Sequence, residues 1–245
     1  MFRNSKMNRI IIFAFFIIFL GCQNKVESNQ NSRKVRKIFY PFAETVRLPQ
    51  TGQTQCYNNF SEIVPCQGTG QDGELRKGAV WPKPRFIENR NGTITDRLTG
   101  LMWERIPFKK PVNWEEAFNR IKDLNVKKFG GYNNWRLPNI NELFSLVNFG
   151  VARQYIWLKS QGFDVFQGQL SLFWSSTTDY IDSIQDNSPG KYVYLLRLFD
   201  GAIGFGDKIG RKSFIARNLY VRSFVIGVRT AGKGVIKLPR TGQTK

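Results

Sequence analysis

The residue types that most often carry catalysis are scarce in this chain. Its 245 residues include no histidine, and its cysteines are Cys22, Cys56 and Cys66. Without an imidazole, Ser-His-Asp and Cys-His nucleophile systems and histidine-ligated zinc are excluded, and three thiols cannot complete a four-cysteine zinc site. The hydroxyl run Ser175–Thr177 lacks a histidine or a clear lysine to act as its base. We therefore expect no enzymatic activity, no cofactor and no metal.

A cluster of cations is the stronger functional signal. The chain has 37 Lys plus Arg against 18 Asp plus Glu, and the stretch 208–229 contains six of these cations and no acid. Such a concentration attracts polyanions, and guanidinium groups pair well with sulfate and carboxylate groups. The alternative is a basic face that is only solvated. The candidate ligand-binding residues for an anionic glycan are Lys208, Arg211, Lys212, Arg217 and Arg222.

The first 21 residues have the pattern of an export signal. A basic start with Arg3 and Arg9 precedes the apolar run 10–20, which is too short to span a bilayer comfortably. A glycine and Cys22 follow, an order that resembles a bacterial lipoprotein signal with an acylated cysteine. The alternative is an ordinary signal peptide with a chance cysteine. We predict acyl chains such as palmitate on Cys22, with the exported protein at the outer membrane or cell surface.

Residues 22–48 are expected to be a flexible basic tether. They contain six basic and two acidic groups among Gln, Asn and Ser, too little apolar surface to form a core. The basic run 33–37 is solvated tail or, alternatively, is attracted to anionic lipid headgroups or polysaccharide near the anchor.

Export favours pairing the two remaining thiols, Cys56 and Cys66, because the compartment is oxidising. Nine residues lie between them. Closing this loop would stabilise the fold by roughly 2 to 3 kcal/mol in the chain-entropy model. The alternative is a catalytic or metal-binding pair, for which no neighbouring ligand set is visible.

Short β-prone segments separated by turns begin at Pro49. The Asn-Gly pair at 91–92 predicts a hairpin between 85–88 and 93–96, because this pair tolerates positive φ. Further strands are expected at 101–104, 173–177, 192–199, 202–205 and 219–229.

Two helices are predicted between these strands. Asn113 and Glu116 have the spacing of a capping box, and apolar residues then recur at helical intervals. Asn139 and Glu142 repeat this signature at the start of a second helix, which should end at 148–150. Strands, then helices, then strands predict an α+β domain with one mixed or antiparallel sheet system and two short helices.

A short repeat frames this domain. Residues 48–54, LPQTGQT, recur as LPRTGQT at 238–244 with six of seven positions identical. We infer an ancestor with tandem domains, of which the second copy is a remnant. The expected organisation is a signal peptide at 1–21, a tether at 22–48, a domain at 49–232 and an exposed basic tail at 233–245.

The ordered blocks of this domain resemble one family. The blocks "NGTITDRLTGLMWER", "GGYNNWRLPNINELFSLVN", "FWSSTTDY" and "RLFDGAIGF" are similar to the Lcl_C domain, the C-terminal domain of a collagen-like bacterial adhesin, over about residues 45–230. The resemblance implies a C-type-lectin-like fold, related to formylglycine-generating enzymes. It also implies a homotrimer and binding of sulfated glycans.

The sequence departs from this family at informative positions. Two cysteines that the family usually carries, a presumed disulfide, are replaced by Ile121 and Gly227. The reactive cysteine pair of the enzyme relatives has no counterpart in a matching motif. The calcium motifs of sugar-binding lectins do not occur, so calcium-dependent sugar binding is unsupported.

The motif residues are expected to be structural. Tryptophans bury large apolar areas while the indole N–H meets a carbonyl, and the Arg136 guanidinium suits a carboxylate or strand-end carbonyls. The alternative is that some of them line a ligand groove. The set comprises Trp103, Trp114, Trp135, Arg136, Leu137, Pro138, Trp174, Ser175 and Ser176.

Three hypotheses about function follow. The first is a membrane-anchored, non-enzymatic module that captures anionic polysaccharide; nucleic acid is electrostatically equivalent, but export makes it less available, and we expect none. The second is an exported enzyme related to the formylglycine-generating group. The third is a structural envelope protein that recognises another protein, with incidental charge.

Overall fold

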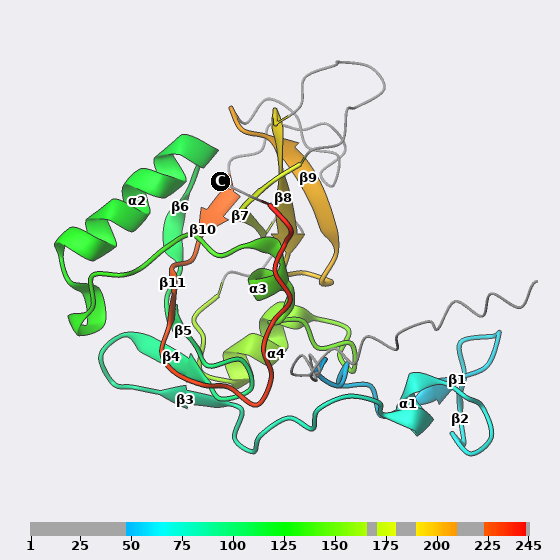
Figure 1. Ribbon diagram of the computed structural model, residues 1–245. Helices are drawn as coiled ribbons and strands as arrows, with labels where there is room; N and C mark the ends of the chain where they lie inside the picture. The colour runs from blue at the N-terminus through cyan, green and yellow to red at the C-terminus, as the bar shows by residue number, and fades with distance from the viewer. Residues whose placement is uncertain (1–47, 166–170, 180–189, 210–222, 244–245) are drawn as a thin grey trace, which may run out of the picture. The chain divides into compact units, whose positions relative to one another are not determined.

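The structure is a computed structural model that describes residues 48–165, 171–179, 190–209 and 223–243 (Figure 1). In this part of the chain, strands and short helices form an α+β domain, which confirms the predicted class. The likeness to C-type lectins stays a prediction. The strands are β1 (Cys56–Tyr57), β2 (Ile63–Val64), β3 (Phe86–Glu88), β4 (Thr93–Asp96), β5 (Leu101–Glu104), β6 (Phe108–Val112), β7 (Leu172–Thr178), β8 (Tyr192–Arg197), β9 (Ile203–Asp207), β10 (Ser223–Val225) and β11 (Val228–Thr230). The helices are α1 (Asp72–Leu75), α2 (Trp114–Val126), η1 (Phe129–Gly131), α3 (Ile140–Phe144) and α4 (Gln154–Ser160).

The largest sheet of the described residues has the order β6-β10-β7-β8-β9. Its neighbours pair antiparallel except for β10 and β7, which are parallel, with Phe224 opposite Phe173. Strand β10, from late in the sequence, therefore lies inside the sheet. The strands expected at 173–177, 192–199 and 202–205 are confirmed as β7, β8 and β9.

A second, antiparallel sheet has the order β11-β5-β4-β3. The predicted hairpin is confirmed, with Phe86 opposite Asp96 and Glu88 opposite Ile94. Gly92 adopts φ 83° in its turn, the conformation that the Asn-Gly signal requires. The strands divide between separate sheets where one sheet system was expected.

Both predicted helices are confirmed with complete capping boxes. In α2, the Asn113 side chain accepts from the Glu116 backbone N–H, and the Glu116 side chain accepts from the Asn113 backbone N–H. Asn139 and Glu142 repeat this exchange in α3. Helix α3 ends at Phe144, earlier than expected. Helices α1 and α4 were not predicted, and neither has a side-chain cap hydrogen bond that the sequence could have signalled.

The β-prone stretch 219–229 was expected to be one strand, and this prediction is wrong in the described part. The stretch forms β10 and β11 in two different sheets. Between them, the Gly227 N–H donates to the Glu104 carboxylate at 2.6 Å, and the Gly227 carbonyl accepts from the Glu104 N–H at 3.0 Å. These bonds to β5 draw the backbone out of the first sheet. Residues 219–222 lie outside the described residues.

Strand β7 is buried on both faces, which explains its unbroken apolar start. Leu172 and Trp174 belong to a core cluster with α2, whereas Phe173 belongs to a cluster with α3 and α4. A strand covered on both sides has a continuous hydrophobic run instead of alternation. The domain is thus built as layers on either side of the five-stranded sheet.

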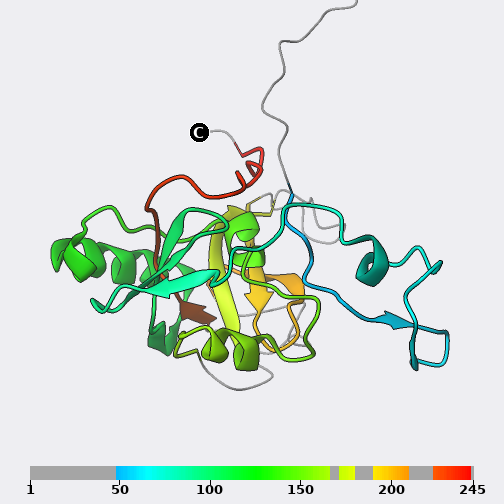
Figure 2. The same ribbon diagram turned by 90° about the horizontal axis from the view of Figure 1, so that it is seen from below.

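The segment after Gly232 was expected to be an exposed basic tail; its cations Lys233, Lys237 and Arg240 are exposed, but a few of its other residues attach it to the domain. The Ile236 N–H donates to the Leu98 carbonyl at 2.9 Å, and Ile236 is only 5% exposed. Leu238 packs against the core cluster of α3 and α4. Apolar residues among the cations therefore fix the segment, whose red trace passes α3 in both views (Figures 1 and 2).

Candidate functional site

Of the five candidate ligand-binding residues, the described part of the chain includes Lys208; Arg229, the last cation of the stretch 208–229, is also described and lies over the Tyr132 ring at 3.8 Å. Lys208 follows β9 directly. Arg211, Lys212, Arg217 and Arg222 lie outside the described residues, as does Cys22. The site is therefore built from Lys208 and its neighbours.

Lys208 lies over an aromatic ring at the start of α2. Its Nζ is 4.5 Å from the centroid of the Trp114 ring, and its carbonyl accepts from the Trp114 N–H at 3.2 Å. The Trp114 Nε1 donates to the Ser175 carbonyl at 2.9 Å, and the Phe118 ring meets it edge-on at 4.7 Å. Partial burial lowers the pKa of Lys208. The ring thus holds a cation at the surface with reduced solvation, where cation–π attraction is strongest.

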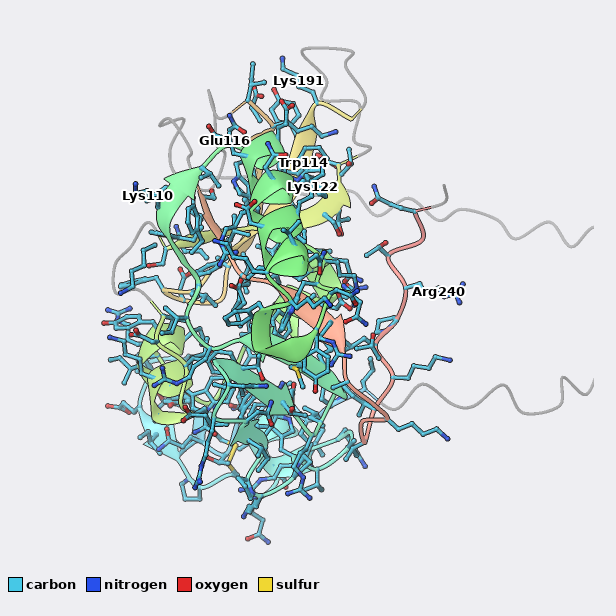
Figure 3. All side chains as sticks on the ribbon, turned by 90° about the vertical axis from the view of Figure 1, so that its left-hand side faces the viewer. Lys110, Trp114, Glu116, Lys122, Lys191 and Arg240 are labelled. Carbon is cyan, nitrogen blue, oxygen red and sulfur yellow. A yellow bond between two sulfur atoms is a disulfide. The ribbon has the colours of Figure 1, made fainter. Side chains whose placement is uncertain are left out.

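Further lysines lie on this side of the domain. The Lys191 carbonyl accepts from the Lys208 N–H at 3.2 Å, which places the two residues side by side. Lys110 is exposed on β6, three residues before the N-cap of α2. In Figure 3, Trp114 lies at the start of α2, Lys110 lies to its left on β6, and Lys191 extends at the top of the view. We call Lys110, Trp114, Lys191 and Lys208 the Lys208 surface.

The predicted structural tryptophans are mostly in the core. Exposed fractions are 0% for Trp103 and Trp174 and 3% for Trp135, while Trp114 is half-buried. The Nε1 of Trp135 donates to the Phe129 carbonyl, and that of Trp174 to the Val112 carbonyl. Among the described residues, the Trp103 Nε1 meets no acceptor. This placement supports the core interpretation over a ligand groove.

Two of the sequence blocks that resemble the family, those around Arg136 and Ser176, are joined in space. Arg136 makes two hydrogen bonds of 2.6 Å to the Glu142 carboxylate, as its fork geometry favours. The Ser176 N–H donates to the Pro138 carbonyl at 2.7 Å, which ties β7 to the start of α3. Ser175 is buried, and its hydroxyl donates to the Tyr194 carbonyl at 2.7 Å. Leu137 is buried beside them with 3% exposure.

Glu104 is a buried charge that the sequence analysis missed. It is 1% exposed, and its Oε1 accepts from Arg120 at 2.8 Å. Burial raises the pKa of Glu104 to about 7, against the lowering effects of Arg120 and the Gly227 N–H. The sequence signal for this buried carboxylate was an acid that directly follows three apolar residues in β5. All four residues are buried.

Glu104 also lies beside one of the family's replaced cysteine positions. A side chain added at Gly227 would place its Cβ 3.1 Å from Glu104 Oε2 and 2.8 Å from the Leu124 methyl group. Ile121, the other replaced position, is buried in α2. Packing and a hydrogen-bonded carboxylate fill this junction.

The predicted pairing of the other cysteines is confirmed. Cys56 and Cys66 form a disulfide with Cα atoms 5.1 Å apart, at the base of the β1–β2 hairpin. Across the described residues, no group of histidine, cysteine, aspartate and glutamate side chains could hold a metal ion. No helix in that same portion of the chain is long and apolar enough to cross a membrane.

These features define a small α+β domain with a basic, aromatic-backed surface and a disulfide-closed hairpin. The model of the Lcl C-terminal domain family matches residues 92–220, more than half of the chain, and the chain belongs to that family. No curated protein and no solved structure matches it.

Proposed function

We propose that this protein is an exported, lipid-anchored binding module that captures anionic polysaccharide at the Lys208 surface without catalysing a reaction. The observation that carries the proposal is the Lys208 ammonium group held over the Trp114 ring, next to Lys191. A fixed, partly desolvated cation pairs more strongly with sulfate or carboxylate than a fully hydrated one.

The charge around this pair supports the same conclusion. Lys110 is exposed on β6, which leads into α2. Of the two acids in the first turn of α2, Glu116 is engaged in the capping box and Glu115 is exposed. In the sequence, the cation-rich stretch 211–222 lies between Lys208 and β10. The described cations Lys110, Lys191 and Lys208 come from different segments of the chain, which favours long anionic chains over single small anions.

The absence of histidine from the whole sequence and the pairing of Cys56 with Cys66 support a role without catalysis. The lipoprotein-like signal that ends at Cys22 supports anchoring by acyl chains at the outer membrane or cell surface.

Heparin-affinity chromatography in a salt gradient tests the binding function. The double variant Lys191→Glu/Lys208→Glu should bind heparin about tenfold more weakly. It loses two lysine–sulfate ion pairs, and an ion pair at a protein surface contributes up to about 1 kcal/mol. The matched control is Lys77→Glu/Lys159→Glu, which makes the same charge change at exposed lysines outside the surface.

Two results would contradict the proposal. One is elution of the wild-type protein no later than a charge-matched, unrelated protein. The other is identical elution of the two double variants, which would show that net charge alone determines retention.

A further inference from the structure

The glycine of the seven-residue repeat has a positive φ in both copies. Gly52 in the first copy has φ 90°, and Gly242 in the second has φ 81°. Both values lie in the region that glycine adopts without strain. The first copy lies at the start of the domain. There Pro49 forms a β-bridge with Ala79, and the Thr51 carbonyl accepts a hydrogen bond from the Phe149 N–H.

The second copy lies in a different place on the same domain. The Asn141 Nδ2 donates to the Pro239 carbonyl at 2.9 Å. The Gln243 amide makes two hydrogen bonds with the Thr178 backbone, donating at 2.7 Å and accepting at 3.3 Å. Leu238 packs against the core cluster of α3 and α4. The motif is therefore held by side-chain contacts at both of its ends.

The surface that holds the second copy is made from two of the sequence blocks that resemble the family. Asn141 belongs to "NWRLPNINEL", and Thr178 closes "FWSSTT". A hydrogen bond of 3.0 Å from the Ile140 N–H to Thr177 Oγ1 connects these blocks. We call the surface around Asn141 and Thr178 the motif receptor.

The motif receptor contacts residues that both copies share. Leu238, Pro239 and Gln243 have identical counterparts in Leu48, Pro49 and Gln53. The position that differs is Arg240, which is exposed and whose side chain points away from the domain in Figure 3. The receptor thus contacts only residues that the two copies have in common, and in its own domain the first copy is held instead by Ala79 and Phe149.

Leu48 supplies an independent observation. It is 61% exposed in its own domain, whereas its counterpart Leu238 is packed against the core. An apolar residue left exposed at the start of the domain can gain burial at a receptor on another domain.

We propose that the motif receptor is an interaction surface for the leading LPxTGQT segment of a second copy of this domain. The chain's own residues 238–243 occupy the receptor in the same way. A segment from another domain binds through the same leucine, proline carbonyl and glutamine amide. The contact joins two different surfaces, so it orders domains head to tail.

A labelled peptide tests this proposal on the full chain. The probe is the first copy with its flanks, residues 46–55, and its binding is measured by fluorescence anisotropy. The chain's own tail competes at an effective concentration of about millimolar order. Releasing the tail with Leu238→Asp/Gln243→Ala should therefore tighten peptide binding at least tenfold, by a rough estimate from the same competition. The control Arg240→Ala should not change it.

The receptor itself is tested in the tail-released chain. Adding Asn141→Ala should weaken peptide binding, because the donor to the proline carbonyl is lost. Far-UV circular dichroism checks that each variant is folded. If the double variant is not folded, Gln243→Ala alone serves, since Gln243 is exposed.

Three results would overturn the proposal. The first is no binding of the peptide to a folded, tail-released chain. The second is equal binding of a scrambled peptide. The third is binding of a peptide of residues 236–245 without binding of residues 46–55, which would show that the receptor fits only the chain's own tail.

Discussion

The hairpin of β1 and β2 and the junction around Glu104 are stabilised in opposite ways. The hairpin has two-residue strands and exposes Phe60 and Ile63 by 84% and 64%, but a disulfide closes it. The junction joins β5, α2 and the turn at Gly227, and it has buried side chains and a hydrogen-bonded carboxylate instead. The disulfide thus closes the region that buries little apolar surface. The region that buries much apolar surface is stabilised by packing instead.

The largest effect is expected from removing a packed side chain near the junction. Trp174→Ala deletes an indole that is 0% exposed and donates to the Val112 carbonyl. We expect the free energy of unfolding in urea to fall by about 3 to 5 kcal/mol. The matched change in the hairpin, Phe60→Ala, should alter it by less than about 0.5 kcal/mol. Similar losses at both positions would contradict the comparison.

A pH-dependent effect should separate the junction from the rest of the domain. The folded pKa of Glu104, about 7, exceeds the ordinary value of 4.5, so between these values the folded protein binds a proton that the unfolded chain has lost. The free energy of unfolding should therefore fall as pH rises from 4.5 to 7, by about 3 kcal/mol from this residue, and then level off.

The variant Glu104→Gln cannot titrate and should lack this component. Urea denaturation at several pH values measures it, with Glu115→Gln, an exposed glutamate of α2, as the control. An unchanged pH profile in Glu104→Gln would show that Arg120 keeps the carboxylate ionised throughout.

The smallest effect on the whole domain is expected from the disulfide. In Cys56→Ser/Cys66→Ser, the hairpin loses roughly 3 kcal/mol of loop-closure stabilisation. Amide exchange at Asn58, whose N–H donates to the Glu62 carbonyl, should become about a hundredfold faster. Exchange at Val193 and Leu195 in the buried sheet should not change. Equal acceleration in both places would mean that the hairpin and the sheet unfold together.

Local signals in the sequence predicted the elements with strong end markers. The capping residues Asn113 and Asn139 fixed the starts of α2 and α3, and the Asn-Gly pair fixed the β3–β4 hairpin. Each signal operates within a few residues, so no knowledge of distant contacts was needed.

Features that depend on distant partners could not be predicted. The split between β10 and β11 arises from Glu104, more than a hundred residues earlier in the chain. The docking of residues 236–243 depends on Leu98, Asn141 and Thr178. For the candidate site, the sequence indicated Lys208 as a cation but not the Trp114 ring beneath it, because the two are far apart in sequence.

The placement of β10 inside the main sheet has a consequence for the order of folding. Strands β6 and β7 both pair with β10, and β5 pairs with β11, so residues 223–230 complete both sheets. Neither sheet can be completed before residues 223–230 are available to pair. These closing contacts join segments that are far apart in sequence, and contacts of that kind slow folding.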